Sequence, residues 1–334
     1  MIRILHPGSQ SIIQDLGRYG YQSLGFSSGG PADRFAHSWA NLLVGNNPQA
    51  ATIEMILQPG EFYFEQDTWA SVTGAVESVW VGDDLLPSWS GFWVEQGSIV
   101  RLNKFYGIYA YLGIQGGIAV EPVMGSRSTD LVAGIGGFFG RRLEKGDNIP
   151  VLPTALKKDW PYDEIRLVDA VPKDNLSPIR VLPGPRKDLL KDHTWKGFLS
   201  QDFIIGLDSN RMGIRLKTHP VLSPIPPPVL SEGMMPGAIE LTPEGSLLLL
   251  LSSRGTLGGY PVIAIVISVD LNRVAQRQLG TAIKFKLTSV EQARKLWQAE
   301  KDFICEKRII WHKRYRKGHP KDSRSVCFHL YSHF

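Results

Sequence analysis

Three arginine residues lie in short motifs rich in glycine and serine: Arg127 in GSRST, Arg211 in SNRMG and Arg254 in SSRGT. A guanidinium group matches carboxylate and phosphate with paired hydrogen bonds. Each arginine is therefore a candidate for holding an anion, and each could equally form an ion pair that orders a loop. The third motif opens the stretch SSRGTLGGYP at 252–261, which interrupts two strongly apolar runs. Such a loop either only reverses the chain or presents side chains and backbone to a ligand.

Several common catalytic signatures are missing from the sequence. It contains no P-loop, no G-x-S-x-G nucleophile motif and no H-E-x-x-H zinc motif. The histidines before residue 301 are scattered without ligand spacing: His6, His37, His193 and His219. For any single glycine motif, a turn or bulge that needs a positive φ is the preferred explanation.

The composition is that of a soluble globular protein, with 43% hydrophobic and 21% charged residues. Of the net charge of +5, residues 301–334 carry +6 and the rest of the chain −1. The main body is therefore not a nucleic-acid surface. No run of about 18 apolar residues is present, and the N-terminus lacks the features of a secretory signal. We expect a cytoplasmic protein without membrane contact.

Short apolar stretches alternate with turn signals over most of the chain, which is typical of β structure. Helical periodicity is confined to residues 31–46, 189–200 and 289–303. The length suffices for two domains, and a charged, proline-rich segment separates two β-rich halves. We therefore expect a mainly β protein with a few helices, divided into a domain at 1–155, a connector at 156–178, a domain at 179–300 and an extension at 301–334.

Several motifs follow one another in a specific order between about residues 2 and 298. They are QDLGRYGYQSLGF, GGPADRFAHSWANLLVGN, EMILQPGEFYFE, GSRSTDLVAGIGGFFGRRLEKGD, RVLPGP, DSNRMGIRL, LSEGMMPGAIEL and GGYPVIAIVISVDLNRVAQ. In these motifs the chain resembles the biotin-dependent carboxyltransferase-like family known as KipA, allophanate hydrolase subunit 2 or the C subunit of 5-oxoprolinase.

The resemblance implies two tandem β-barrel domains of cyclophilin-like type. It implies a partner similar to KipI or to the B subunit of 5-oxoprolinase, with a third, lactam-hydrolase-type subunit in the complete enzyme. That complex opens 5-oxoproline to glutamate at the expense of ATP, whereas relatives in urea carboxylase move a carboxyl group from biotin to urea. ATP is thus the implied cofactor, and the sequence itself supports no biotin site. Other relatives relieve inhibition of a sensor kinase, so the alternative is a non-catalytic regulatory protein that acts through a KipI-like partner.

The resemblance also implies where the site lies. Both reactions create an oxyanion, which fixed backbone N–H groups and an arginine can stabilise. We expect Arg254, Glu240 and Arg127 to be catalytic. Asp33 and Arg34 lie in the first turn of a helix, and we interpret them as structural. The substrate-binding candidates are Ser128, Arg211, Met212, Glu232, Gly237, Ser253, Thr256, Gly258, Gly259 and Tyr260.

The loop at 252–264 departs from the family pattern. Members usually carry ADRQTTGGYPKIA where this chain has SSRGTLGGYPVIA, so Ser253 replaces an aspartate and Val262 a lysine. In the preceding strand Glu240 replaces a glutamine. The changes at Ser253 and Val262 remove a carboxylate and an ammonium group from the presumed site. Two interpretations stay open: an enzyme with a different substrate, in which Glu240 and Arg254 act as the polar groups, or a copy that folds and pairs but turns over slowly or not at all.

Residues 301–334 have no counterpart in the family pattern and are strongly basic. Such a segment suits nucleic acid or anionic lipid, but we expect no nucleic-acid role. Zinc ligands are present without a standard spacing, and we predict no metal site; they are Cys305, His312, His319, Cys327, His329 and His333. We favour a poorly ordered extension.

Overall fold

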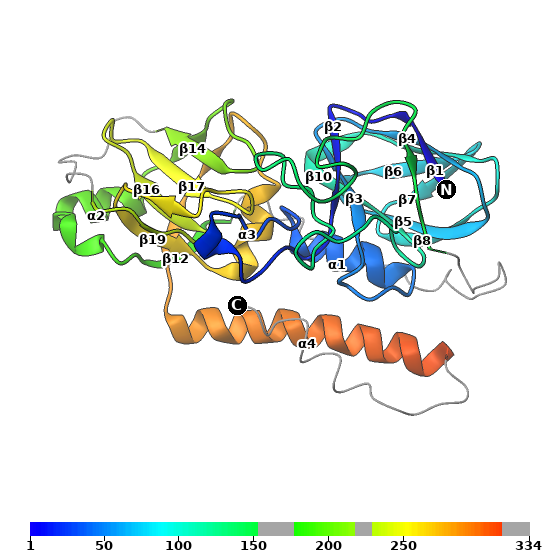
Figure 1. The fold of residues 1–334 in the computed structure, drawn as a ribbon. Helices are drawn as coiled ribbons and strands as arrows, with labels where there is room; N and C mark the ends of the chain where they lie inside the picture. Colours follow the sequence, from blue (N-terminus) through cyan, green and yellow to red (C-terminus); the bar gives the residue numbers. More distant parts are fainter. Residues whose placement is uncertain (153–176, 218–228, 316–334) are drawn as a thin grey trace.

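The computed structural model describes residues 1–152, 177–217 and 229–315, without the side chains of 307–315. These residues form a mainly β protein, as predicted from the turn-punctuated apolar stretches. Figure 1 shows two β-rich halves side by side, with one long helix running along both. The described residues form four α-helices: α1 (Arg34–Leu43), α2 (Asp192–Ser200), α3 (Ser268–Ala275) and α4 (Val290–Tyr315).

The N-terminal half contains two antiparallel sheets that enclose one hydrophobic core. In the first sheet the strand order is β11 (Asn148–Ile149), β1 (Ile2–His6), β4 (Glu61–Phe64), β9 (Ile99–Leu102), β6 (Ser78–Val81) and β7 (Asp84–Pro87). In the second it is β2 (Gln10–Gln14), β3 (Thr52–Ile56), β10 (Phe105–Ile114), β5 (Thr68–Val76) and β8 (Ser90–Val94).

Helix α1 packs on β10 and β5, and the sequence explains where the helix begins and how it packs on the sheet. The Asp33 side chain accepts a hydrogen bond from the Ala36 N–H at 2.9 Å and so caps the first turn. All nine residues of β5 are buried, including polar ones. Ser71 and Thr73 satisfy their hydroxyl groups by donating to the carbonyls of Ala40 and Ala36, at 2.6 and 2.7 Å.

The C-terminal half is built around an eight-stranded sheet with its own hydrophobic core. The order is β20 (Ala282–Ile283), β13 (Phe203–Ile205), β14 (Gly213–Lys217), β17 (Leu247–Leu250), β16 (Ala238–Leu241), β19 (Val262–Val266), β12 (Ile179–Pro183) and β21 (Phe285–Leu287). Its edge strands β20 and β21 adjoin in sequence, so the sheet is nearly closed like a barrel. A small ribbon of β15 (Glu232–Gly233) and β18 (Leu257–Gly258) stands beside it.

The helices predicted at 31–46, 189–200 and 289–303 correspond to α1, α2 and α4. Helix α3 follows directly on the β-branched residues of β19, and no periodic signal marks its start. Helix α4 extends to Tyr315, so the first part of the region that we expected to be poorly ordered is helical. Most of the predicted connector and residues 316–334 lie outside the described residues, and the domain boundaries stay a prediction.

Candidate functional site

A pocket of about 300 Å³ opens in the C-terminal half, between strands β14, β16 and β17 and the loop at 255–260. Five of the predicted site residues line it together: Met212, Glu240, Gly258, Gly259 and Tyr260. The sequence separates them by almost 50 positions, and the antiparallel pairing of β14 with β17 and of β17 with β16 brings them to one place.

Glu240 is the titratable side chain buried in this pocket. The pairing of β16 with β19 shifts register between Ile239 and Glu240, and such a bulge re-aims a side chain. Glu240 is only 3% exposed, and the backbone N–H of Tyr260 donates to its carboxylate. Among the described residues its Oε1 has no hydrogen-bond partner. A buried acceptor without a donor is costly, so this oxygen is suited to a ligand that supplies one.

The environment also tunes the proton affinity of Glu240. Burial raises the pKa of Glu240 to about 6, although the Tyr260 N–H acts in the opposite direction. At neutral pH the ionised carboxylate accepts hydrogen bonds, and at lower pH the protonated form donates one. A carboxyl group with its pKa close to the working pH is suited to proton transfer.

Gly258 keeps the space next to this carboxylate open. A Cβ atom at this position would lie 2.5 Å from the Glu240 Oε1 and 3.1 Å from the side chain of Met234. Any larger residue would displace the carboxylate or the wall of the pocket. Glycine at position 258 is therefore explained by close approach to Glu240.

Arg211 lies between the two halves of the molecule and does not line the pocket. It forms an ion pair with Glu54 of β3 and donates to the Gly30 carbonyl at 2.6 Å. The hydroxyl oxygens of Ser252 and Ser253 lie 3.4 Å from its guanidinium nitrogens. Burial lowers the pKa of Arg211 to about 9, which leaves it charged at neutral pH. The cation is thus engaged within the chain.

Arg254 makes a second connection between the halves. Its Nε donates to the Met234 carbonyl at 3.0 Å and its Nη1 to the Ser28 hydroxyl at 3.3 Å. Burial lowers the pKa of Arg254 to about 10. The Thr256 carbonyl accepts the Met234 N–H at 2.9 Å. Arg254 and Thr256 therefore hold the segment around Met234, which forms one wall of the pocket.

Arg127 and Ser128 lie in the N-terminal half, around Asp15. The Arg127 N–H donates to the Asp15 Oδ2 at 2.5 Å, and its Nε donates to the Val120 carbonyl at 2.8 Å. The Ser128 hydroxyl donates to the Asp15 Oδ1 at 2.7 Å. These contacts order the loop at 126–128. The structure does not bring Arg127 or Ser128 into the pocket of Glu240.

The last two predicted residues also have structural contacts. Glu232 pairs with Arg186, with both side chains about one-third exposed. Gly237 has a φ of +86°, a conformation that glycine adopts without strain, and its N–H donates to the Leu250 carbonyl at 2.8 Å.

Sequence reasoning missed two groups of residues. Asp208 and Arg215 line the pocket and pair at 3.1 Å, with more than half of each side chain exposed. The signal was available, because both belong to the motif DSNRMGIRL. Glu54, the partner of Arg211, was missed as well, although it is a charged residue within an apolar strand.

Among the described residues, no group of three His, Cys, Asp or Glu side chains is arranged to hold a metal ion. No helix of this part of the chain is long and apolar enough to cross a membrane. Of the zinc candidates in the extension, Cys305 lies in α4. The side chains of the other candidates, His312, His319, Cys327, His329 and His333, lie outside the described residues.

Comparison with known proteins gives one consistent result. Residues 24–287 match the model of the family described as "Carboxyltransferase domain, subdomain A and B". The chain is 34% identical to the C subunit of 5-oxoprolinase from Escherichia coli, over 93% of its own length and 98% of that protein. The corresponding protein of Haemophilus influenzae is 32% identical, with the same coverage. The crystal structure of Kluyveromyces lactis urea carboxylase matches 92% of the chain with a TM-score of 0.82 at 28% identity, but the match covers only 29% of that larger protein.

Proposed function

Because the chain belongs to the carboxyltransferase domain subdomain A and B family, we propose that it is the C subunit of an ATP-dependent 5-oxoprolinase-like complex. Similarity to two 5-oxoprolinase C subunits over nearly their full length supports the proposal. The structural observation that carries it is the buried Glu240 Oε1, which lacks a donor and borders a pocket of about 300 Å³.

In this proposal Glu240 orients a lactam in the pocket. The ionised carboxylate accepts a hydrogen bond from the lactam N–H, and Gly258 leaves the room that this requires. In the net reaction, one water molecule adds across the lactam C–N bond, and a second is consumed as ATP is converted to ADP and phosphate. The carbonyl carbon gains a hydroxyl group and the nitrogen gains a proton. Because the pKa of Glu240 is about 6, its carboxylate is ionised at neutral pH and can accept the hydrogen bond of the lactam N–H.

Arg127, Arg211 and Arg254, the three arginines predicted to hold an anion, do not line the Glu240 pocket. Arg127, Arg211 and Arg254 donate to carbonyls, hydroxyls or carboxylates of the chain itself. This favours the alternative in which the three arginines order loops. We therefore assign ATP binding to the partner subunits and propose no biotin site for this chain.

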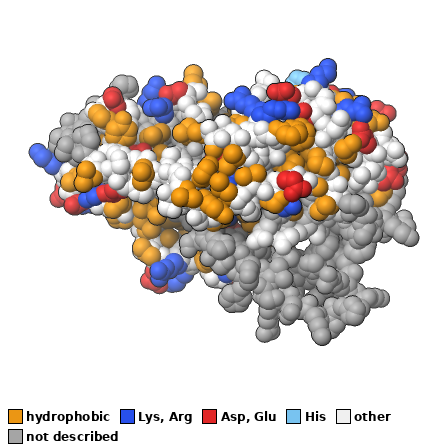
Figure 2. Space-filling view, in the orientation of Figure 1, with side chains coloured by type: hydrophobic (Ala, Val, Ile, Leu, Met, Phe, Trp, Pro, Cys, Tyr) orange, Lys and Arg blue, Asp and Glu red, His pale blue; other side chains and the backbone are white. Residues whose placement is uncertain are grey.

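A partner similar to KipI or to the B subunit of 5-oxoprolinase completes the proposal. Figure 2 shows hydrophobic side chains gathered in the middle of the visible face, where the two halves meet. Several large apolar side chains are strongly exposed, and extended apolar surface favours a protein partner; they include Leu24, Val132, Phe139, Met235 and Leu257. We also propose cyclophilin-like barrels for the two halves and a cytoplasmic location.

One observation favours the regulatory alternative. Val262, which stands where the family usually has lysine, is buried in an apolar cluster with Met234, Ala238 and Leu250. The wall next to the pocket thus has no ammonium group at this position. A KipA-like regulator would bind its KipI-like partner tightly without turnover.

The test is an assay of 5-oxoproline-dependent ADP release after co-expression with a KipI-like and a lactam-hydrolase-type partner. We expect Glu240→Ala to lower this rate by about 10–10²-fold, because it removes the group that accepts the lactam N–H. Glu240→Gln restores the usual family residue, so we expect it to retain activity while losing the dependence on pH near 6. The matched control is Glu244→Gln in the same hairpin, where the side chain is exposed. An assembled wild-type complex without 5-oxoproline-dependent release would contradict the catalytic proposal and favour the regulator.

A further inference from the structure

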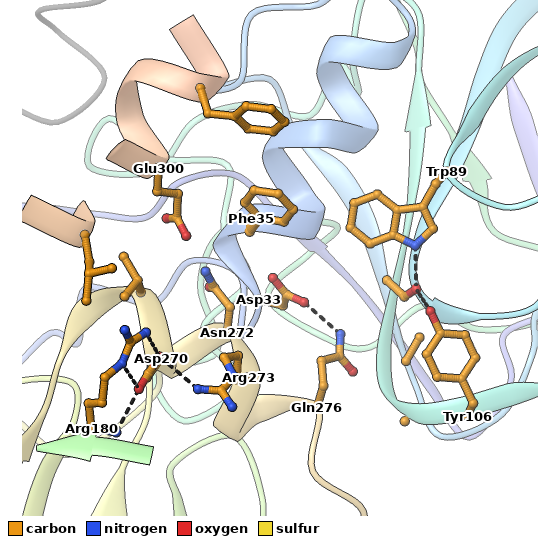
Figure 3. A pocket seen from close by; sticks show the side chains of 16 residues that line it. Asp33, Phe35, Trp89, Tyr106, Arg180, Asp270, Asn272, Arg273, Gln276 and Glu300 are labelled. Carbon is orange, nitrogen blue, oxygen red and sulfur yellow. Dashed lines mark hydrogen bonds and ion pairs between the residues drawn. The ribbon is translucent and has the colours of Figure 1, made fainter. Parts of the chain in front are cut away.

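A second cavity, of about 380 Å³, lies between the two halves and α4, and it shares no lining residue with the Glu240 pocket. The N-terminal half contributes Asp33, Phe35 and Trp89, and α3 and α4 contribute Asn272 and Glu300. Figure 3 shows the Glu300 carboxylate pointing from α4 toward Asn272 and Asp33. The cavity is therefore formed by the packing of both halves and helix α4 against one another.

One side of the cavity is aromatic. The Trp89 Nε1 and the Tyr106 hydroxyl both donate to the Gly74 carbonyl, at 3.0 and 3.1 Å. Their polar groups are thus satisfied by the backbone, and their rings remain as apolar surface. The Phe35 ring lies 6.0 Å from the Trp89 ring, centroid to centroid. Such a wall suits a hydrocarbon body and attracts a cation over its ring faces.

The charged groups of the lining are unequally satisfied. Asp270 pairs with Arg180 at 2.6 Å and with Arg273 at 3.2 Å. Both oxygens of Asp33 accept hydrogen bonds at 2.9 Å, one from the Ala36 N–H and one from the Gln276 amide. The lining contains three carboxylates and two guanidinium groups. Among the described residues, nothing donates a hydrogen bond or forms an ion pair with the carboxylate of Glu300.

The proton affinities reflect this imbalance. Burial, together with the charges of Asp33 and Asp270, raises the pKa of Glu300 to about 7, although Arg34 acts in the opposite direction. Burial raises the pKa of Asp33 to about 6. Arg34 compensates the charge of ionised Glu300 only in part, so a bound cation would stabilise it further.

We propose that this cavity binds a small organic cation, a protonated primary amine with an aromatic or aliphatic body. The ammonium group contacts Glu300, within the field of Asp33, and the body packs on Phe35 and Trp89. Since the ligand would touch both halves and α4, its binding stabilises their packing. The inference concerns a different cavity from the proposed active site and does not depend on it.

The test is isothermal titration calorimetry of the full-length chain with 2-phenylethylamine, compared with neutral 2-phenylethanol and anionic 3-phenylpropionate. We expect binding of the amine alone, and an affinity that rises about 10-fold from pH 6 to pH 8 as Glu300 ionises. Glu300→Gln should weaken binding by about 10-fold or more and reduce the pH dependence to the roughly 2-fold part that Asp33 contributes. The control is Glu306→Gln, since Glu306 is an exposed residue of the same helix.

Circular dichroism melting verifies that both variants are folded before the titrations are compared. Equal binding of the amine and the alcohol would overturn the proposal, because it would mean an apolar cavity without preference for a cation. Absence of amine binding, or binding that Glu300→Gln leaves unchanged, would overturn it as well.

Discussion

The interface between the two halves, where Arg211 pairs with Glu54, differs from the candidate site in how it satisfies a buried glutamate. We call this interface the seam. Glu54, fully buried, pairs with Arg211 and also accepts the Tyr111 hydroxyl and the Ala32 N–H, each at 2.9 Å. Glu240 is 3% exposed and accepts a hydrogen bond from the Tyr260 N–H, but its Oε1 has no partner among the described residues. Both carboxylates are removed from water, but only one is satisfied by its own chain.

The difference separates structural from functional charge. A buried ion pair whose remaining lone pairs are hydrogen-bonded holds its surroundings in one arrangement, although it contributes little net stability. A carboxylate with an unsatisfied oxygen destabilises the free protein and gains from a ligand that donates a hydrogen bond. Breaking the pair at Glu54 should therefore destabilise the protein, whereas neutralising Glu240 should relieve a cost.

The largest effect is expected at the seam. Arg211→Met leaves Glu54 charged and uncompensated in the interior, so we expect the free energy of unfolding to fall by about 3–5 kcal/mol. Urea denaturation at pH 7 followed by fluorescence measures it. The matched control is Arg215→Met, since Arg215 pairs with Asp208 at the surface and should cost less than about 1 kcal/mol. Similar losses for the two variants would remove the distinction between seam and surface.

Arg254→Ala tests a residue that belongs to both regions, because Arg254 lies in the seam and also contacts the pocket wall. Loss of its bonds to Met234 and Ser28 should lower the free energy of unfolding by about 1–3 kcal/mol. The sequence further predicts that it abolishes activity of the reconstituted complex, and the structure gives a route for this through the position of Met234. ADP release is to be measured per folded molecule, at a temperature where the variant stays folded. An unchanged rate would assign Arg254 to the seam alone.

The sequence predicted the mainly β class and three of the helices because these depend on local periodicity and caps, such as Asp33 at the start of α1. It also predicted the residues of the pocket through motifs whose order is specific. It did not show that Arg211 is paired within the chain whereas Glu240 keeps an oxygen without a partner. A motif shows that a charged residue lies in a loop or strand, but not which residue pairs with it. The partner of Arg211 is Glu54, 157 positions earlier in the chain. Such long-range pairs, and the cavity under α4, arise only when the halves pack.

The stability cost of burying the Glu240 carboxylate can be tested with Glu240→Gln, by measuring the free energy of unfolding as a function of pH. The folded-state pKa of Glu240 is raised from 4.5 to about 6, so the wild type is relatively most stable below pH 4.5 and loses stability as the pH rises through 6. That loss should amount to about 1–2 kcal/mol. The variant lacks it, so its stability relative to wild type should increase between pH 4.5 and pH 7. Asp33 and Glu300 titrate in both proteins and cancel from the difference. Parallel pH profiles of the two proteins would show that Glu240 carries no burial penalty.

The smallest effect is expected at Glu232, which the motif pattern placed among the substrate-binding residues. Its pair with Arg186 is about one-third exposed on both sides, and such pairs contribute about 0–1 kcal/mol. Glu232→Gln should therefore lower the free energy of unfolding by no more than about 0.5 kcal/mol. It should also leave the KM for 5-oxoproline of the reconstituted complex unchanged, because Glu232 does not line the pocket of Glu240. A marked rise in KM at unchanged stability would make Glu232 a ligand contact and extend the site from the pocket to the ribbon of β15 and β18.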